Sequence, residues 1–524
     1  MGGSIRWLAA ILFANLAAAC SSPIDGPQMA GGQPSREGGA PMLAEASAAD
    51  PDSGPREGGY SDASASPLVD GGGAIGAGDA APTPTGLDDG AVVAIDSGSA
   101  GDTGGQIGSA AAASDGGMND AAPLEGGTAM TFITRKGLTF DDGGKRYVFV
   151  GTNFWPGMNL GVASVGDPAR LVRELDRLKM LGITNVRLLA SSQGPDTEPY
   201  RVMPALVTQP GTYNEEVFRG LDRLLDELAK RGMRAVMVLN NYWEWSGGMA
   251  QYVSWANKSK IPYRLAPGGN YATFVMYVDG FYGCSACQTE YRANVAAIVH
   301  RVNTLNGRMY RDDPVIFSWQ LANEPRDYPP NWINDTAQYV KSIDPNHLVS
   351  VGSEGTWAAD FVTTHQSPFV DYTTCHIWVE NWGKYDPNDA SGTSLASATA
   401  FATGYLRANE MAARQLGKPL VLEEFGLARD GWSAGGKFDP AATVTHRDAY
   451  YQSLYEVVIA SLGSGQGALA GDSFWAWGGE ARPPSRWAGD PPHETSGWYS
   501  VYDADRSTTA LIASHASAVK AFAR

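Results

Sequence analysis

Two glutamates of this 524-residue chain stand where a carboxyl group can do chemistry. Glu324 lies between Asn323 and Pro325, Glu424 precedes Phe425, and each follows a run of residues that indicates a buried strand. Hydrolysis of a glycosidic bond needs two carboxyl groups, one to protonate the leaving oxygen and one to act as nucleophile or base. The two glutamates therefore predict glycoside hydrolysis, provided that the fold brings them together.

Further polar and aromatic residues follow other predicted strands. Indole rings can pack against sugar faces, and amide, imidazole and guanidinium groups can hydrogen-bond to hydroxyl groups. Core packing is the alternative for each tryptophan, and His376 could instead be a buried structural histidine. The candidate set around the two glutamates is Trp155, Arg187, Asn240, Asn241, Trp243, Asn323, His376, Trp378, Trp475 and Trp477.

The elements that must position these residues alternate between short β-branched or aromatic runs and stretches of helical periodicity, which favours βα units. Strands are expected at 147–152, 185–189, 234–240, 315–321, 348–351, 372–376, 420–424 and 473–477. Helices are expected at 168–181, 215–231, 288–303, 396–416 and 443–462, with residues 241–285 as the longest loop. Eight units predict an α/β fold of the (β/α)8 TIM-barrel class, whose working residues lie at the carboxyl ends of the strands.

The composition changes sharply near residue 130. Residues 21–130 contain 24 glycines, one aromatic residue and no lysine. Such a segment cannot bury enough apolar surface to offset its ordering entropy, so we expect a disordered linker over 21–130 and a barrel domain over 131–524. The net charge of −17 is concentrated in the linker, since the barrel domain has 36 Lys and Arg against 40 Asp and Glu. A nearly neutral domain without a basic stripe excludes nucleic-acid binding as the expected function.

Residues 1–20 indicate an export signal. Arg6 is followed by an apolar run over 7–19, which is short for a membrane span, and small residues precede Cys20. The stretch Leu16-Ala-Ala-Ala-Cys20 resembles a bacterial lipobox, in which Cys20 would be lipidated; an ordinary secretory signal is the alternative. With Ser21 next to Cys20, the resemblance implies delivery to a Gram-negative outer membrane.

Longer motifs resemble glycoside hydrolase family 5, a retaining (β/α)8 family, and more narrowly its endo-β-1,4-mannanase branch. The motifs are SWQLANEPR at 318–326, KPLVLEEFG at 418–426, FWAW at 474–477, NNYWEWSGGMAQYVSW at 240–255 and the segment 291–326. The resemblance implies an exported enzyme that cleaves mannan, glucomannan or galactomannan without a cofactor, with the polysaccharide as its partner and a monomer as its state. The alternatives are an endo-β-1,4-glucanase of the same fold and a non-catalytic surface protein that binds carbohydrate.

The same resemblance implies that Glu324 is the acid/base and Glu424 the nucleophile. It further implies that Asn323 contacts the sugar and that Arg187 keeps the pKa of the nucleophile low. Trp475 is expected to form the floor of the subsite that holds the distorted sugar. Strand alternation puts the side chain of Glu423 on the opposite face from Glu424, as a structural partner of a neighbouring strand. Many relatives have tyrosine where this chain has Trp378, so a hydroxyl that often bonds the nucleophile is missing or comes from elsewhere, and we expect Trp378 to contact substrate.

The remaining cysteines allow two arrangements. Cys284 and Cys287 are spaced for a local disulfide in an exported protein, which would leave Cys375 buried on a strand. The alternative is a zinc site formed by the three cysteines and His376, for which a single CxxC pair is little support. We therefore expect no metal.

Overall fold

The computed structural model describes residues 130–355, 359–389, 391–431 and 438–523. The expected signal sequence over 1–20, with Cys20, and residues 21–129 of the expected linker lie outside the described residues. No helix of the described part is long and apolar enough to cross a membrane.

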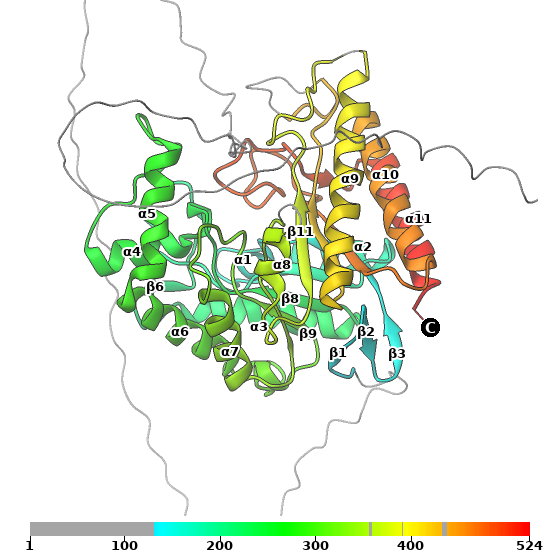
Figure 1. The fold of residues 1–524 in the computed structure, drawn as a ribbon. Helices are drawn as coiled ribbons and strands as arrows, with labels where there is room; N and C mark the ends of the chain where they lie inside the picture. Colours follow the sequence, from blue (N-terminus) through cyan, green and yellow to red (C-terminus); the bar gives the residue numbers. More distant parts are fainter. Residues whose placement is uncertain (1–129, 356–358, 390, 432–437, 524) are drawn as a thin grey trace, which may run out of the picture. The chain divides into compact units, whose positions relative to one another are not determined.

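Eight parallel strands form the expected barrel (Figure 1). Their order around the sheet is β10-β9-β8-β5-β4-β13-β12-β11, and Val349 O accepts from Asp371 N at 2.8 Å where the two ends of this order approach each other. The fold-class prediction is confirmed. The strands are β4 Phe149–Asn153, β5 Asn185–Leu189, β8 Arg234–Val238, β9 Ile316–Gln320, β10 Leu348–Ser350, β11 Thr373–Ile377, β12 Leu420–Phe425 and β13 Leu469–Phe474.

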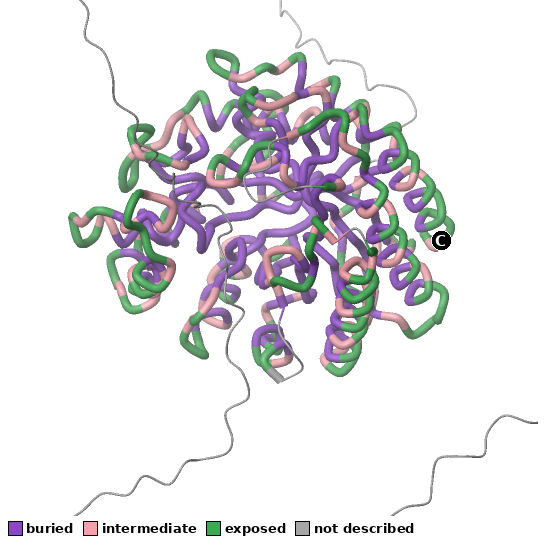
Figure 2. Tube along the Cα trace, turned by 90° about the horizontal axis from the view of Figure 1, so that it is seen from above, coloured by how far each residue is buried: buried purple, intermediate pink, exposed green. Residues whose placement is uncertain are grey.

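Helices surround this barrel, and burial falls from the central strands to the outer helix faces (Figure 2). The helix α2 begins after Asp167, whose side chain accepts from Arg170 N, and Pro168 occupies its first turn. In Figure 1, α9, α10 and α11 run side by side. Helices that follow or precede the barrel strands are α2 Pro168–Met180, α3 Glu215–Lys230, α6 Ser285–Val299, α7 Trp332–Ile343, α9 Thr393–Leu416, α10 Thr445–Gly463 and α11 Arg506–Lys520.

A small antiparallel sheet packs against the amino-terminal ends of the barrel strands. It consists of β1 Ile133–Lys136, β2 Thr139–Asp142 and β3 Lys145–Tyr147. Phe140 of β2 is fully buried against Phe317 and Tyr372, with ring centroids 5.0 and 5.5 Å apart. This end of the barrel is therefore filled by aromatic side chains, and the polar candidates belong to the other end.

Two expectations about elements are wrong. Residues 241–285 do not form one long loop, because they contain the helices α4 Gly248–Asn257 and α5 Tyr271–Gly283, which residues 258–270 connect. The eighth barrel strand runs over Leu469–Phe474, so Trp475 and Trp477 follow it instead of lying on it. Gly471 lies in this strand because the ring of Phe149 fills the place where its side chain would be, a tertiary contact that local propensity does not report.

The cysteines follow the first of the two arrangements. Cys284 and Cys287 form a disulfide at the start of α6, and Cys375 of β11 is a buried thiol. The bonded pair excludes the zinc site that would need all three thiolates.

Candidate active site

Glu324 is held directly beyond β9 by its backbone. Its φ of 48° is in the left-handed region that non-glycine residues rarely adopt, and its N–H donates to Gly352 O at 2.8 Å. The side chain is 5% exposed, and its Oε2 accepts from Nε1 of Trp243 at 2.6 Å. The strained backbone and the indole N–H thus fix the carboxyl group at the mouth of the barrel.

Glu424 reaches the same place through an irregularity in β12. In the pairing of β12 with β11, Leu422 is opposite Cys375 and Glu424 is opposite His376, so Glu423 is an extra residue without a partner. Glu423 accepts from Nε2 of Gln320 at 2.8 Å, and it lies 3.7 Å from Nε of Arg187. The expectation that Glu423 points away from Glu424 is wrong, because this bulge lets both side chains face the barrel interior.

Arg187 of β5 joins the groups that surround Glu424. One guanidinium nitrogen, Nη1, donates to Glu424 and to Oδ1 of Asn153, and Nη2 donates to Oδ1 of Asn323 at 2.7 Å. Its Nε donates to Oε1 of Gln320 at 2.8 Å. Arg187 is 3% exposed, and each of its three nitrogens donates within the protein, so it orients the Asn323 amide and the Glu424 carboxylate together.

The side chain of His376 contacts the carboxyl groups of both Glu324 and Glu424. Nδ1 of His376 lies 2.7 Å from Oε1 of Glu324 and 3.3 Å from Oε2 of Glu424. One ligand atom from each of the three residues lies within 4.8 Å of the others. A carboxyl separation of about 5 Å fits the double-displacement geometry of retaining glycosidases, in which no water stands between the nucleophile and the sugar.

The charges of these groups are coupled. Burial holds the pKa of Glu424 above its usual value in the unliganded site; Arg187 lowers this pKa as expected, and His376 acts in the same direction, but burial outweighs them. Burial also acts on Glu324, but the hydrogen bond and charge of His376 lower its pKa to about 2. Burial acts on His376 against the charges of Glu424 and Glu324, which raise its pKa to about 10. In the unliganded site the acidic proton is therefore held on the imidazole, next to Glu324.

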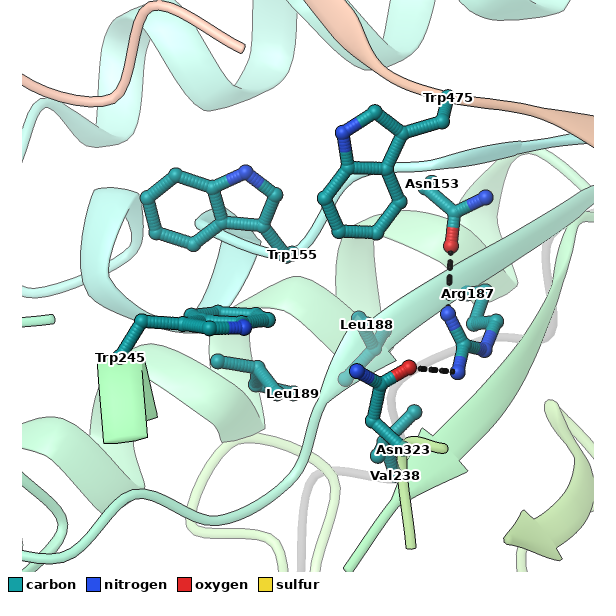
Figure 3. Close-up of a pocket in the computed structure, with 9 residues that line it drawn as sticks. All are labelled: Asn153, Trp155, Arg187, Leu188, Leu189, Val238, Trp245, Asn323 and Trp475. Carbon is teal, nitrogen blue, oxygen red and sulfur yellow. Dashed lines mark hydrogen bonds between the residues drawn. The ribbon is translucent and has the colours of Figure 1, made fainter. Parts of the chain in front are cut away.

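Aromatic side chains line the hollow above these groups (Figure 3). Trp155, Trp245 and Trp475 stand around it, with Arg187 and Asn323 on one side. Trp378, Trp243 and Trp475 line the adjoining part that contains Glu324 and Glu424. Trp378 is 9% exposed, and its ring centroid lies 6.0 Å from that of Trp475. Within the described residues no hydroxyl group donates to Glu424.

Three of the residues predicted to lie around the glutamates do not line this hollow. Asn241 accepts from Trp243 N and from Nδ2 of Asn323, so it orients two lining residues and is itself fully buried. Asn240 holds the backbone of Asn241 with its Oδ1. Trp477 donates its indole N–H to Glu174 of α2 at 2.9 Å, which makes it a packing residue.

Several residues that line the hollow were not predicted from the sequence as site residues. Trp245 lies two residues beyond Trp243, a spacing that could have suggested it. Asn381, His493 and Glu494 also line the hollow, and the ring of His493 stacks on that of Trp245 at 5.9 Å. The segment that carries His493 and Glu494 follows strand β14 (Trp477–Gly479), and no local pattern marks it as part of the site.

The triad of Glu324, His376 and Glu424 also has the composition of a metal-binding group. Its ligand atoms are already used, because Glu324 accepts from Trp243 and His376, and Glu424 accepts from Arg187. A cation would also lie beside the Arg187 guanidinium. These contacts favour a site that works with protons alone.

Comparisons with known proteins show the family of the chain. The family model described as "GH family 5 beta-mannosidase-like" matches residues 130–524. The putative mannan endo-1,4-beta-mannosidase 9 of Oryza sativa subsp. japonica is 33% identical over 367 residues, which cover 66% of this chain and 81% of that protein. Mannan endo-1,4-beta-mannosidase 1 of Arabidopsis thaliana is 29% identical over 371 residues, 66% of this chain and 81% of that protein.

Among solved structures, a glycoside hydrolase family 5 mannosidase from Rhizomucor miehei is 40% identical, with a TM-score of 0.72 over 76% of this chain and 99% of that chain. A glutamate-to-alanine variant of it, solved in complex with mannosyl-fructose, has a TM-score of 0.71 and 40% identity, covering 75% of this chain and 98% of that chain. The endo-β-1,4-mannanase from Thermotoga petrophila, at 24% identity and a TM-score of 0.54 over 72% of this chain and 77% of that chain, shares the fold.

Proposed function

Because this chain belongs to the β-mannosidase-like branch of glycoside hydrolase family 5 and is a glycoside hydrolase, we propose that it cleaves β-1,4-mannosidic linkages in mannan, glucomannan or galactomannan. The observation that supports this proposal most is the meeting of Glu324 and Glu424 through His376 inside a tryptophan-lined hollow. Two carboxyl groups at this separation suit a double displacement that retains the anomeric configuration.

In this reaction the proton held by His376 passes to Glu324 along their hydrogen bond, and Glu424 attacks the anomeric carbon while that proton goes on to the leaving oxygen. The glycosidic bond breaks and an ester between the sugar and Glu424 forms. A water molecule then gives a proton to Glu324, attacks the same carbon and releases Glu424 as a carboxylate. Within this scheme Asn323 binds the sugar, and Trp475, Trp378, Trp155 and Trp243 surround it.

Sizing the products tests the proposal. Residues 130–524 are incubated with linear mannan, galactomannan and carboxymethylcellulose, and the Glu424→Ala variant serves as control. We expect reducing ends to appear with the mannans and not with the variant. A preference for carboxymethylcellulose would establish a glucanase instead, and no release from any polymer would favour a protein that only binds carbohydrate.

Where along the chain the enzyme cuts is a separate question. The endo-acting relatives and the branch resemblance support internal cleavage, giving oligosaccharides of many lengths. One observation favours a second mode, release of single units from chain ends: Glu324 and Glu424 are only 5% and 3% exposed, beneath the segment that carries His493. The product pattern at low conversion separates the two modes.

We also propose that the protein acts as an exported monomer that a lipid on Cys20 anchors to the outer membrane. The support is the lipobox-like sequence before Cys20 and a site formed by residues of one chain. Mass spectrometry of the native N-terminus tests it, since a diacylglycerol on Cys20 is expected. Protein in the medium with an unmodified Cys20 would establish plain secretion.

A further inference from the structure

Two guanidinium groups lie against the indole ring of Trp243. Cζ of Arg264 is 5.0 Å and Cζ of Arg326 is 4.9 Å from the centroid of this ring. Arg264 lies in the connection between α4 and α5, whereas Arg326 follows Glu324 by two positions, so different parts of the chain bring the two charges together. A cation within about 6 Å of an indole face is attracted by the π electrons of the ring. Trp243 therefore takes part in two cation–π contacts.

Hydrogen bonds to other side chains hold both arginines in place. Nε of Arg264 donates to Oε1 of Glu244 at 3.1 Å. Arg326 donates through Nη2 to Oε2 of Glu354 at 2.7 Å and through Nη1 to Oη of Tyr271 at 3.2 Å. The side chains of Arg264 and Arg326 are 6% and 23% exposed, so solvent screens their charges less than those of surface arginines. Both charges are therefore fixed next to the indole.

The indole of Trp243 links these charges to the acid/base. Its Nε1 donates to Oε2 of Glu324 at 2.6 Å. A cation against the ring withdraws electron density from the indole and makes the N–H hydrogen more positive, which strengthens the bond that it donates. Burial raises the pKa of Glu324, but His376 lowers it to about 2, and the charge of Arg326 and the indole bond act in the same direction. The carboxylate that forms when Glu324 gives up its proton thus meets a donor placed in advance.

A second bond between an indole and a carboxylate lacks these cations. Nε1 of Trp319 donates to Oδ2 of Asp344 at the same 2.6 Å. Within the residues that the structure describes, no arginine or lysine lies over the ring of Trp319. Packing alone therefore does not bring cations to an indole that donates to a carboxylate. The two arginines lie beside the tryptophan whose partner takes part in proton transfer.

We propose that Arg264 and Arg326 are positioning residues for proton transfer by Glu324. Their charges polarise the indole of Trp243, and its N–H then binds the Glu324 carboxylate more strongly as the proton leaves for the glycosidic oxygen. This inference rests on the proposed function, because it concerns the acid/base of that reaction. Arg264 also lines the hollow beside the two glutamates, so Arg326 gives the cleaner test.

Leaving groups of different acidity test this role in the chain 130–524. A phenyl β-mannoside needs a proton on its leaving oxygen, whereas a 2,4-dinitrophenyl β-mannoside needs little protonation. Arg326→Gln and Arg264→Gln each remove one charge, and Arg326→Lys keeps it. Arg292→Gln is the matched control, because it removes a guanidinium whose Cζ lies 5.3 Å from the ring centroid of Tyr339, between α6 and α7. The readout is kcat/KM for release of the phenol, with the corresponding mannobiosides where these react faster.

We expect Arg326→Gln and Arg264→Gln each to lower kcat/KM about tenfold for the phenyl substrate and to leave it within about twofold for the dinitrophenyl substrate. Arg326→Lys should restore most of the loss, and Arg292→Gln should change neither value. Equal losses with the two substrates would overturn the proposal, since a structural effect does not depend on the leaving group. If Arg326→Gln unfolds, Arg264→Gln decides.

A double-mutant cycle tests whether the effect passes through the indole N–H. Trp243→Phe keeps a ring beside both arginines and removes the bond to Glu324. In that background Arg326→Gln should lower kcat/KM for the phenyl substrate less than about threefold, because the bond that the charge strengthens is gone. An undiminished tenfold loss would overturn the proposal in favour of a direct action of the charge on Glu324. A wild-type chain that releases phenol from none of these substrates and does not cleave mannotetraose would instead refute the proposed function.

Discussion

Nδ1 of His376 lies 2.7 Å from Oε1 of Glu324, so the proposed acid shares a hydrogen bond with a group whose own pKa is raised to about 10. The same nitrogen is 3.3 Å from Oε2 of Glu424. The imidazole and the two carboxyl groups thus titrate as one unit beside the permanent charge of Arg187, and changes at His376 should appear in the pH dependence of the reaction.

Replacing His376 with glutamine should narrow the pH range of activity from both sides. Glu424 must be ionised, and burial already raises its pKa; without the imidazolium that pKa rises further, so the acidic limb moves to higher pH. The proton needed at Glu324 is lost at lower pH once His376, with its pKa of about 10, no longer holds it, so the alkaline limb moves down. The check is kcat/KM against pH. If kcat/KM fell equally at every pH and neither limb of the profile moved, the coupling between His376 and the two glutamates would be contradicted.

The indole N–H of Trp243 should matter for the reaction as well as for packing. Trp243→Phe keeps an aromatic ring and removes the 2.6 Å bond to Oε2 of Glu324. A hydrogen bond to a charged group contributes about 1.5–3 kcal/mol, so kcat should fall about 10- to 100-fold.

A matched control for that variant is Trp319→Phe, which removes an indole bond of the same 2.6 Å length to Asp344. Asp344 follows α7 and is not part of the hollow. We expect Trp319→Phe to lower the melting temperature and leave kcat within twofold. Equal losses of kcat in the two variants would mean that the Trp243 bond acts through stability alone.

Glu423 should be needed for both stability and rate, because it lies in the barrel interior. In Glu423→Gln an amide N–H₂ would face the N–H₂ of Gln320, leaving a buried donor unpaired at a cost of about 1–3 kcal/mol. We expect a melting temperature several degrees lower and a smaller kcat. Glu456→Gln changes an exposed glutamate that also accepts from a glutamine, Gln452 at 2.9 Å, and should change neither quantity. Unchanged behaviour of both variants would show that Glu423 is dispensable.

Removing residues 1–129 should leave the enzyme intact. The composition of residues 21–130 predicts a linker without a core, and the family match begins at residue 130. We expect residues 130–524 and the mature chain to have the same melting temperature and the same kcat/KM on a soluble substrate. A melting temperature several degrees lower for the shorter chain would refute the linker interpretation.

The barrel and its two glutamates could be predicted because the signals are local. The strand expected at 185–189 has the bounds of the observed β5, because Val186, Leu188 and Leu189 mark a short buried strand between two helical stretches. Glu324 follows β9, Glu424 lies at the carboxyl end of β12, and each has recognisable neighbours in the sequence. For these residues the sequence pattern and the tertiary structure agree.

The features of the site that could not be predicted from the sequence depend on tertiary contacts. The bulge in β12 puts Glu423 inside the barrel, and no feature of Leu-Val-Leu-Glu-Glu-Phe distinguishes it from an evenly alternating strand. His493 and Glu494 enter the site because a long segment after β14 folds over it, which depends on contacts such as Trp155 with Gly489. Asn241 was expected to contact the substrate, but it is buried behind Asn323, whose Nδ2 donates to it. A position after a strand end does not tell which of two such residues faces the substrate.

The assignment of Glu424 as nucleophile and Glu324 as acid/base is tested most directly by the stereochemistry of azide products. With 2,4-dinitrophenyl β-mannoside, Glu424→Ala should be inactive until azide is added, and azide should enter the vacated space and give the α-mannosyl azide. Glu324→Ala should still form the glycosyl-enzyme, because this leaving group needs little protonation, and azide should then give the β-mannosyl azide. An α-azide from Glu423→Ala, with none from Glu424→Ala, would contradict the account.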